Sequence, residues 1–428
     1  MRFRYSAAEN GKLVKKAVVY TQDEHGINFS DVDSQAVYTT ERLQHSGYET
    51  YIVGGAVRDL ILGKKPKDFD IATSASPARI KKIFRNARVI GRRFRLVHVY
   101  FGPKIIEVST FRSLKDGATS NTFGTIEEDV LRRDFSVNAL FYDPVKQLVV
   151  DYVGGMKDIR NQLIRPIIAL NDIFTDDPVR MIRAVKYAVT SNFKLPFSLR
   201  RKIKKESSLL ETISPSRLTE EIFKIINSPY ASEIVTELDA LGLYCYIQPN
   251  AAELFKTRPL FRDRYLKSIS ALNKEDEAKQ PGEKLASLIK DYLADESGWN
   301  AESGGADQAA ATKTSGEEIN AQSDRYKDAF MLVRKFVLPM NPPRIELDNA
   351  LRLLFAEQGI TVKKSRSRDR PPRLNQGREA LKTEESKEST ETKTTTASAG
   401  KDSETKKGHH KKRRRQRKKT AEKTHQGE

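Results

Sequence analysis

The sequence predicts an α+β protein, with a small mixed β-sheet head, an all-helical region after it and a disordered basic tail. Three observations predict this class. Short apolar runs bounded by glycine or proline, typical of strands, lie before residue 165. Helical apolar periodicity dominates from about residue 166. Beyond Thr361 the composition is of low complexity, and 22 Lys and Arg stand against 10 Asp and Glu, which accounts for most of the net charge of +19.

These shifts in pattern divide the chain into six segments. We expect a polar leader, a mixed-sheet head, a helical neck and body, a disordered insertion, a further helical segment and a disordered Lys/Arg-rich tail. Their expected bounds are 1–36, 37–165, 166–293, 294–325, 326–360 and 361–428.

Composition excludes several classes of protein. At 428 residues the chain is long enough for two or three domains. Its single cysteine, Cys245, excludes a disulfide framework and a Cys-rich zinc site. No apolar run reaches the ~18 residues that a membrane helix needs, and the first residues lack the apolar core of a signal peptide. We therefore expect a cytoplasmic protein that does not bind membranes.

The stretch 51–70, YIVGGAVRDLILGKKPKDFD, holds the first candidate site. An apolar strand ends at Gly54 and Gly55, whose missing side chains permit a positive φ and a close approach of the backbone to a ligand. A short helix with Arg58 follows, and the amides at its start favour an anionic phosphate. A Gly-Gly turn alone is common and carries little weight, so the order strand, turn, helix, strand is what makes this signal specific.

Carboxylates on neighbouring strands predict a metal site. Asp68 and Asp70 lie two apart in the expected second strand and so share one face. Two like charges on one face repel unless a cation lies between them, and hard oxygen ligands suit Mg²⁺. Glu107, amid apolar residues of the strand 104–110, is either a third metal-facing carboxylate or a solvent-facing residue on an edge strand.

Two further clusters combine arginine with acid. The run 127–142 has a helical apolar pattern and contains Arg133, Asp134 and Asn138, the last two being four apart on one helix face. These charges are either an exposed helix face or a phosphate site. Asp176 and Asp177 precede Pro178 at the expected start of a helix, with Arg180 and Arg183 within their reach. They form either capped ion pairs or a rigid Asp/Arg pair that hydrogen-bonds the edge of a base.

Polyanion-binding residues are expected outside these clusters. The Arg-rich run after Gly91 contributes Arg92 and Arg93. The tail can neutralise phosphates, although a disordered solubilising tail is the alternative. The tail residues that we expect to bind RNA are Lys411, Lys412, Arg413, Arg414, Arg415, Arg417, Lys418 and Lys419.

With these motifs in order, the chain resembles the class II nucleotidyltransferases that extend RNA 3′ ends, which include bacterial poly(A) polymerases and CCA-adding tRNA nucleotidyltransferases. The resemblance runs from about Tyr51 to Ala188 and continues more weakly through the helices. It implies a nucleotidyltransferase head followed by helical neck and body segments. It also implies that Asp68, Asp70 and Glu107 bind two Mg²⁺ ions, with Asp134 completing the catalytic set.

The resemblance also assigns the nucleotide contacts. Arg133, Asp134 and Asn138 match the motif that binds the sugar and triphosphate, and Asp177 and Arg180 match the pair that reads the base. Arg183, Arg58 and the two glycines complete the expected nucleotide site. At position 176 the family generally has Glu, whereas this chain has Asp176.

Within the family, residues 91–99 (GRRFRLVHV), residues 63–70 and the Arg-rich tail are similar to the poly(A) polymerase branch. The expected reaction is addition of AMP from ATP to RNA 3′ ends in RNA polyadenylation and turnover, with the RNA-degradation machinery as a possible partner. The alternatives are a CCA-adding tRNA nucleotidyltransferase and a non-catalytic RNA-binding protein on the same scaffold. Three repelling carboxylates argue against the last, because a binding protein has no need of them.

Overall fold

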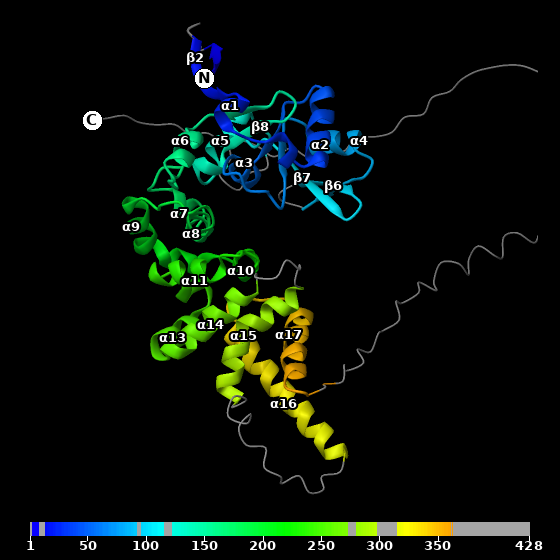
Figure 1. Ribbon diagram of the computed structural model, residues 1–428, viewed down its shortest axis with the longest axis vertical. Coiled ribbons are helices and arrows are strands. Elements are labelled where there is room, and N and C mark those ends of the chain that lie inside the picture. Colours follow the sequence, from blue (N-terminus) through cyan, green and yellow to red (C-terminus); the bar gives the residue numbers. More distant parts are fainter. Residues whose placement is uncertain are drawn as a thin grey trace, which may run out of the picture. The chain divides into compact units, whose positions relative to one another are not determined.

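The computed structural model describes residues 2–7, 13–91, 96–114, 122–272, 280–297, 315–360 and 362. Its head is built on a nine-stranded sheet of order β1-β2-β9-β8-β3-β4-β7-β6-β5 (Figure 1). The strands are β1 (Arg2–Ala7), β2 (Leu13–Tyr20), β3 (Thr50–Val53), β4 (Asp70–Thr73), β5 (Ala87–Ile90), β6 (Leu96–Phe101), β7 (Lys104–Thr110), β8 (Leu140–Asp143) and β9 (Leu148–Asp151).

One strand pair makes the sheet mixed. β4 and β7 run parallel, whereas the other neighbours in the sheet are antiparallel. Parallel neighbours need a long crossover connection, which is supplied here by α4 (Pro77–Ile83) and the hairpin of β5 and β6. The expected α+β class, with a small mixed sheet in the head and helices after it, is confirmed.

Both faces of the sheet are covered because apolar residues alternate along its central strands. Ile52 and Ile71 point into the main core, whereas Tyr51 and Val53 point into a smaller core on the other face. The remaining helices of the head are α1 (Gln22–His25), α2 (Ser34–His45), α3 (Gly55–Ile61), α5 (Ile126–Leu131) and α6 (Gly155–Arg160).

The first 36 residues are not the polar leader that the sequence predicts. β1 and β2 form an antiparallel hairpin, and Val18 to Tyr20 of β2 pair with β9, so this segment belongs to the sheet. Arg4 fixes the hairpin to the head, since it donates to Glu49 at 2.7 Å and to the Tyr152 hydroxyl at 2.9 Å. The local sequence pattern does not reveal these strands, because the strand with which β2 pairs lies about 130 residues later in the chain.

The described part of the chain after the head is helical, as expected. Its helices are α7 (Ile173–Asp176), α8 (Val179–Ser191), α9 (Phe197–Glu206), α10 (Pro215–Ile226), α11 (Ala231–Ala240), α12 (Tyr244–Ile247), α13 (Pro249–Thr257), α14 (Pro259–Ala271), α15 (Pro281–Ser297), α16 (Ser315–Phe336) and α17 (Arg344–Glu357). None of the helices among the described residues has the length and apolar content needed to cross a bilayer.

Helices occupy both ends of the expected insertion 294–325. α15 continues to Ser297 and α16 begins at Ser315, so the helical patterns extend further into this polar segment than composition suggests. Residues 298–314 lie outside the described residues, as do Arg92, Arg93 and the whole Lys/Arg-rich run of the tail.

Candidate active site

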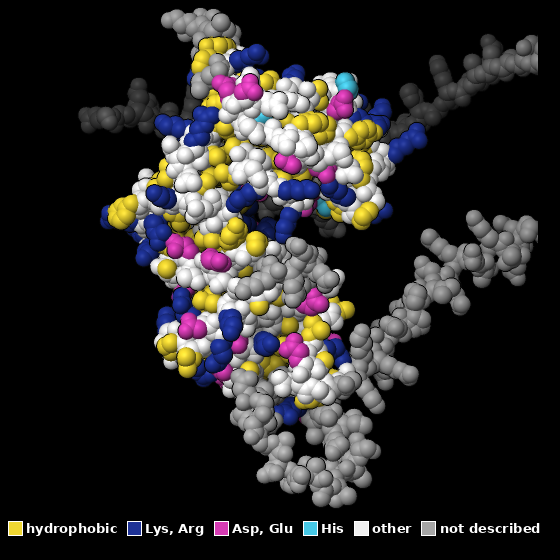
Figure 2. Space-filling model, viewed as in Figure 1, with side chains coloured by type: hydrophobic (Ala, Val, Ile, Leu, Met, Phe, Trp, Pro, Cys, Tyr) yellow, Lys and Arg dark blue, Asp and Glu magenta, His cyan; other side chains and the backbone are white. Residues whose placement is uncertain are grey.

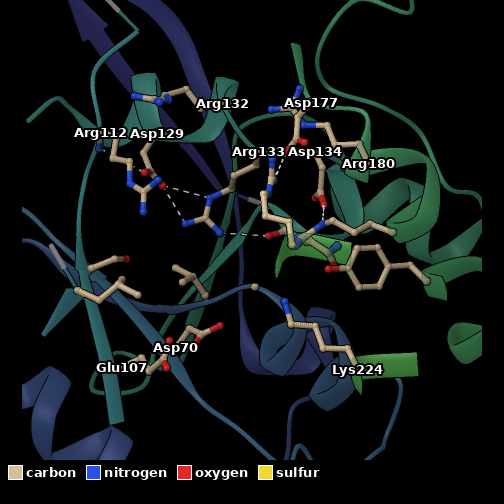
Figure 3. A pocket seen from close by; sticks show the side chains of 18 residues that line it. Asp70, Glu107, Arg112, Asp129, Arg132, Arg133, Asp134, Asp177, Arg180 and Lys224 are labelled. Atoms are coloured by element: carbon tan, nitrogen blue, oxygen red, sulfur yellow. Dashed lines mark hydrogen bonds and ion pairs between the residues drawn. The ribbon is translucent and has the colours of Figure 1, made fainter. Parts of the chain in front are cut away.

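A cleft of about 650 Å³ is lined by residues of the head together with residues of α8 and α10, and its volume is within the range of ligand pockets (Figure 3). In the space-filling view, Lys and Arg side chains border a hollow below the head (Figure 2). The residues that line the cleft are Val53, Gly54, Asp70, Leu96, Glu107, Ser109, Arg112, Asp129, Arg132, Arg133, Asp134, Asn138, Asp177, Arg180, Arg183, Tyr187, Arg217 and Lys224.

Gly54 forms the turn at one wall of the cleft. β3 ends at Val53, and Gly54 takes a φ of 75° just before α3 begins at Gly55. A Cβ at Gly54 would lie 3.7 Å from Oδ2 of Asp70. The turn therefore needs glycine for its backbone conformation, and it brings the start of α3 next to a carboxylate.

Asp70 and Glu107 lie side by side because β4 and β7 are parallel and in register at these two residues. Residues paired in this way point to the same face of the sheet, and in Figure 3 both side chains lie at one end of the cleft. Asp68 precedes the strand and is exposed, so it is not the strand residue that the sequence predicts.

The carboxylates repel one another. Burial, then the charge of Glu107 and also that of Asp68, raise the pKa of Asp70 to about 6, against the opposite effect of Arg133 and Arg183. No group of three or more His, Cys, Asp or Glu side chains in the described residues is already arranged to hold a metal ion. Still, the chemistry of the oxygen donors and the unbalanced negative charge at Asp70 fit a divalent cation.

The opposite wall of the cleft is cationic. Arg133 donates from Nη2 to Oδ2 of Asp129 at 2.8 Å and from Nη1 to the backbone oxygen of Asn138 at 3.3 Å. Arg183 donates from Nε to Oδ2 of Asp134 at 2.7 Å. Burial acts to raise the pKa of Asp134, but the charge and hydrogen bond of Arg183 outweigh it, so the pKa lies below its usual value.

Asp134 and Asn138 do not share a helix face as predicted. α5 ends at Leu131, Asp134 follows it in a turn, and Asn138 ends a short 3₁₀ helix (Ser136–Asn138) before β8. The next strand is buried on both faces, with Leu140 and Tyr142 in the main core and Phe141 in the smaller one, and its packing overrides the helical pattern. Both residues nevertheless line the cleft, and Asn138 contributes to the lowered pKa of Asp134.

Arg58 supports the site from behind. It is buried, is not among the residues that line the cleft, and donates from Nη1 to Oδ1 of Asn138 at 2.7 Å. Its remaining nitrogens bind Asp59. The structure therefore gives Arg58 a contact with Asn138, and the direct nucleotide contact that the sequence predicts stays a prediction.

The Asp/Arg cluster at 176–183 is paired differently from the expected arrangement. Arg180 is buried and binds Asp176, and it also donates to the backbone oxygen of Ile173 at 3.1 Å. Asp177 instead binds Arg217 of α10 at 2.8 Å. The rigid acid–arginine arrangement is present, but it consists of two pairs that share the cleft wall.

Several residues of the cleft have no signal in the sequence pattern. Arg217 and Lys224 lie on α10, some 150 residues beyond Asp70, on what reads as an ordinary amphipathic helix. Lys224 binds the buried Glu221 at 2.9 Å, and Glu221 also pairs with Lys186 at 3.2 Å. Only the spacing of Arg217, Glu221 and Lys224, four and then three residues apart on one side of the helix, could have suggested a second functional face.

Comparisons with known proteins agree with the arrangement of the head. Residues 50–165 match the model of the poly A polymerase head domain, and residues 192–255 match a model described as a probable RNA and SrmB-binding site of polymerase A. Poly(A) polymerase I of Escherichia coli O157:H7 is 41% identical over 266 residues, which cover 58% of this chain and 57% of that protein.

Other similar proteins are CCA-adding enzymes. The CCA-adding enzyme of Geobacillus kaustophilus is 35% identical over 236 residues, which cover 53% of this chain and 58% of that protein. The crystal structure of the Bacillus stearothermophilus CCA-adding enzyme in complex with CTP is 27% identical, with a TM-score of 0.49, over 76% of this chain and 82% of that chain. This chain thus matches little more than half the length of the curated relatives.

Proposed function

We propose that this chain is a template-independent nucleotidyltransferase that adds AMP from ATP to RNA 3′ ends, since residues 50–165 match the poly A polymerase head-domain model. In this reaction the RNA 3′-hydroxyl releases its proton to solvent and its oxygen forms a bond to the α-phosphorus of ATP, while the bond from that phosphorus to the oxygen that bridges to the β-phosphate breaks and pyrophosphate leaves. The observation that carries the proposal is the pairing of Asp70 and Glu107 beside Gly54, in a cleft whose other wall is arginine-rich.

The chain's own residues can do the positioning that phosphoryl chemistry requires. Arg133 and Arg183 would face the phosphates, where fixed cations offset the charge of the triphosphate. Asn138, oriented by Arg58, would contact the sugar. The pairs Asp176–Arg180 and Asp177–Arg217 would present fixed donors and acceptors to the base.

We further propose that Asp68, Asp70 and Glu107 hold Mg²⁺. When bound, such ions supply Lewis-acid activation of the attacking hydroxyl and stabilise the leaving oxygens, in a two-metal arrangement. Asp70 and Glu107 are positioned for this by the register of their strands, and Asp68 is close enough that its charge raises the pKa of Asp70.

Extension of two labelled RNAs tests the activity. A generic oligomer and a tRNA lacking its CCA end are incubated with Mg²⁺ and each nucleoside triphosphate in turn. A long ladder with ATP alone on the generic oligomer is the expected result. Addition of C, C and A to the tRNA followed by arrest would favour the CCA-adding alternative, which the 35% identity to a CCA-adding enzyme keeps in view.

We also propose that α9 carries RNA toward the cleft. Phe197, Arg201, Lys204 and Lys205 recur at helical spacing on one exposed face, opposite the buried Leu199 and Ile203. Phe197 is 81% exposed, and none of the three cations has an ion-pair partner among the described residues. Stacking on an aromatic ring beside unpaired cations is how single strands are commonly bound.

Charge reversal on this face tests the RNA contact. The triple variant R201E/K204E/K205E is expected to raise the KM for RNA and to flatten the log–log salt dependence of binding by about 2, at roughly 0.7 for each phosphate lost. Its matched control is R79E/K81E/K82E on α4, whose side chains are also exposed. An equal loss in both triples would mean that general charge, and not this face, attracts RNA.

The cellular role remains a proposal. Polyadenylation that leads to RNA turnover, an association with the RNA-degradation machinery, and a cytoplasmic location would follow from this activity. They are supported by the names of the relatives and by the basic tail.

A further inference from the structure

A row of polar side chains crosses the sheet at the floor of the cleft. Asp70 on β4 pairs with Glu107 on β7, and Glu107 pairs in turn with His98 on β6. Directly paired residues point to the same face of a sheet, so the strand register alone places His98 beside Glu107. The two side chains are in contact, with Nε2 of His98 3.2 Å from Oε1 of Glu107.

The surroundings of His98 restrict its ring. Tyr100, two residues along the same strand and on the same face, packs edge-on against the imidazole with ring centroids 6.2 Å apart. The His98 side chain is 19% exposed, against 48% for Glu107. The less mobile imidazole therefore sets the position of one oxygen of the more exposed carboxylate and leaves the other oxygen available.

We propose that His98 is a positioning residue, which holds the Glu107 carboxylate next to Asp70 so that the two can share a divalent cation. The proposal rests on the proposed function, since it assumes that Glu107 is a metal ligand. Residues that contact a metal's ligands without touching the metal usually change its affinity by about 10–100-fold when they are removed.

A purely structural role is the competing explanation. Cross-strand pairs stabilise sheets by a small amount wherever they occur, and such a role would alter thermal stability without altering cation affinity. Direct measurement of cation binding separates the two explanations, whereas activity alone does not.

The experiment measures Mn²⁺ binding to the full chain by the electron paramagnetic resonance signal of free Mn²⁺, beside the thermal midpoint of each variant. His98→Ala should weaken Mn²⁺ binding at least about tenfold, whereas His98→Gln, which keeps an N–H donor at a similar reach, should stay within about threefold of wild type. His45→Ala, a change at an exposed histidine on α2, is the matched control and should bind as wild type does.

The possible outcomes distinguish a failure of the positioning role from a failure of the proposed function. If Glu107→Ala abolishes Mn²⁺ binding while His98→Ala leaves it unchanged, the positioning role is wrong and the metal site stands. If wild type binds no Mn²⁺ and extends no RNA, both the positioning role and the proposed function are wrong. A lower thermal midpoint in His98→Ala with unchanged Mn²⁺ binding would also reject the positioning role, in favour of a structural one.

Discussion

Replacing Asp70 with asparagine should stabilise the metal-free protein while abolishing RNA extension. The pKa of Asp70 is raised to about 6 from 3.8, so its ionised form is disfavoured in the folded state. A shift of this size corresponds to at most about 3 kcal/mol of destabilisation at neutral pH. Because Asp70 opens to solvent in the cleft, screening reduces this, and about 1 kcal/mol is a reasonable expectation.

The sign of this change in stability follows from the linkage between proton binding and folding. A carboxyl whose pKa is higher in the folded state than in the unfolded state destabilises the fold once it is ionised, fully above pH 6, and ceases to do so below pH 4. Asp70→Asn should therefore melt about 1–2 °C above wild type at pH 7.5, and the difference should shrink as the pH falls from 6 toward 4.

Thermal unfolding followed by circular dichroism in the presence of a chelator measures this difference. Asp31→Asn, an exposed acid remote from the cleft, is the control and should match wild type. Addition of Mg²⁺ should stabilise wild type and not Asp70→Asn, since only a protein that binds a ligand gains stability from it. A lower midpoint for Asp70→Asn at pH 7.5, or a difference independent of pH, would refute the reasoning.

Three other substitutions test the walls of the cleft. Arg183→Met should lower the free energy of unfolding, measured in urea, by about 3 kcal/mol, because it leaves the buried Asp134 without its ion-pair partner. The double variant Arg183→Met/Asp134→Asn should recover much of this loss. Equal stability of the single and double variants would contradict the reasoning. Arg217→Ala should reduce the preference for ATP over CTP in kcat/KM about tenfold, since Asp177 loses its partner. An unchanged ratio would remove Arg217 from base selection. Gly54→Ala should cost about 1 kcal/mol of stability, because φ at this position is 75°, and a midpoint equal to wild type would show that the turn relaxes.

The parts of the site that the sequence predicts are those defined by local order. Gly54 and Asp70 lie within one strand–turn–helix–strand unit, and Glu107 lies on a strand whose alternation is evident. Local pattern fixes which face each side chain takes, so it also fixes that these residues can meet. That Asp70 and Glu107 are paired residues depends on the parallel strand order, which the sequence only implies through the family resemblance.

The parts that local pattern misses depend on distant partners. The hairpin before Tyr20 pairs with β9, and Arg217 reaches the cleft from a helix that looks no different from its neighbours. Asp134 lies in a turn, since the residues of β8 after it are buried on both faces of the sheet and their packing outweighs the helical spacing. Propensity is a weak guide where tertiary packing decides the conformation.

The parallel pairing of β4 with β7 also determines when the active site can form. Asp70 and Glu107 are 37 positions apart, and their strands meet only after the intervening helix and hairpin have been placed across the sheet. Closing that loop has an entropic cost before any contact is gained, which delays such pairings in folding. A nascent chain that ends before β7 can form the turn at Gly54 but brings no second carboxylate to Asp70. The second carboxylate of the site is therefore added only when β7 pairs with β4.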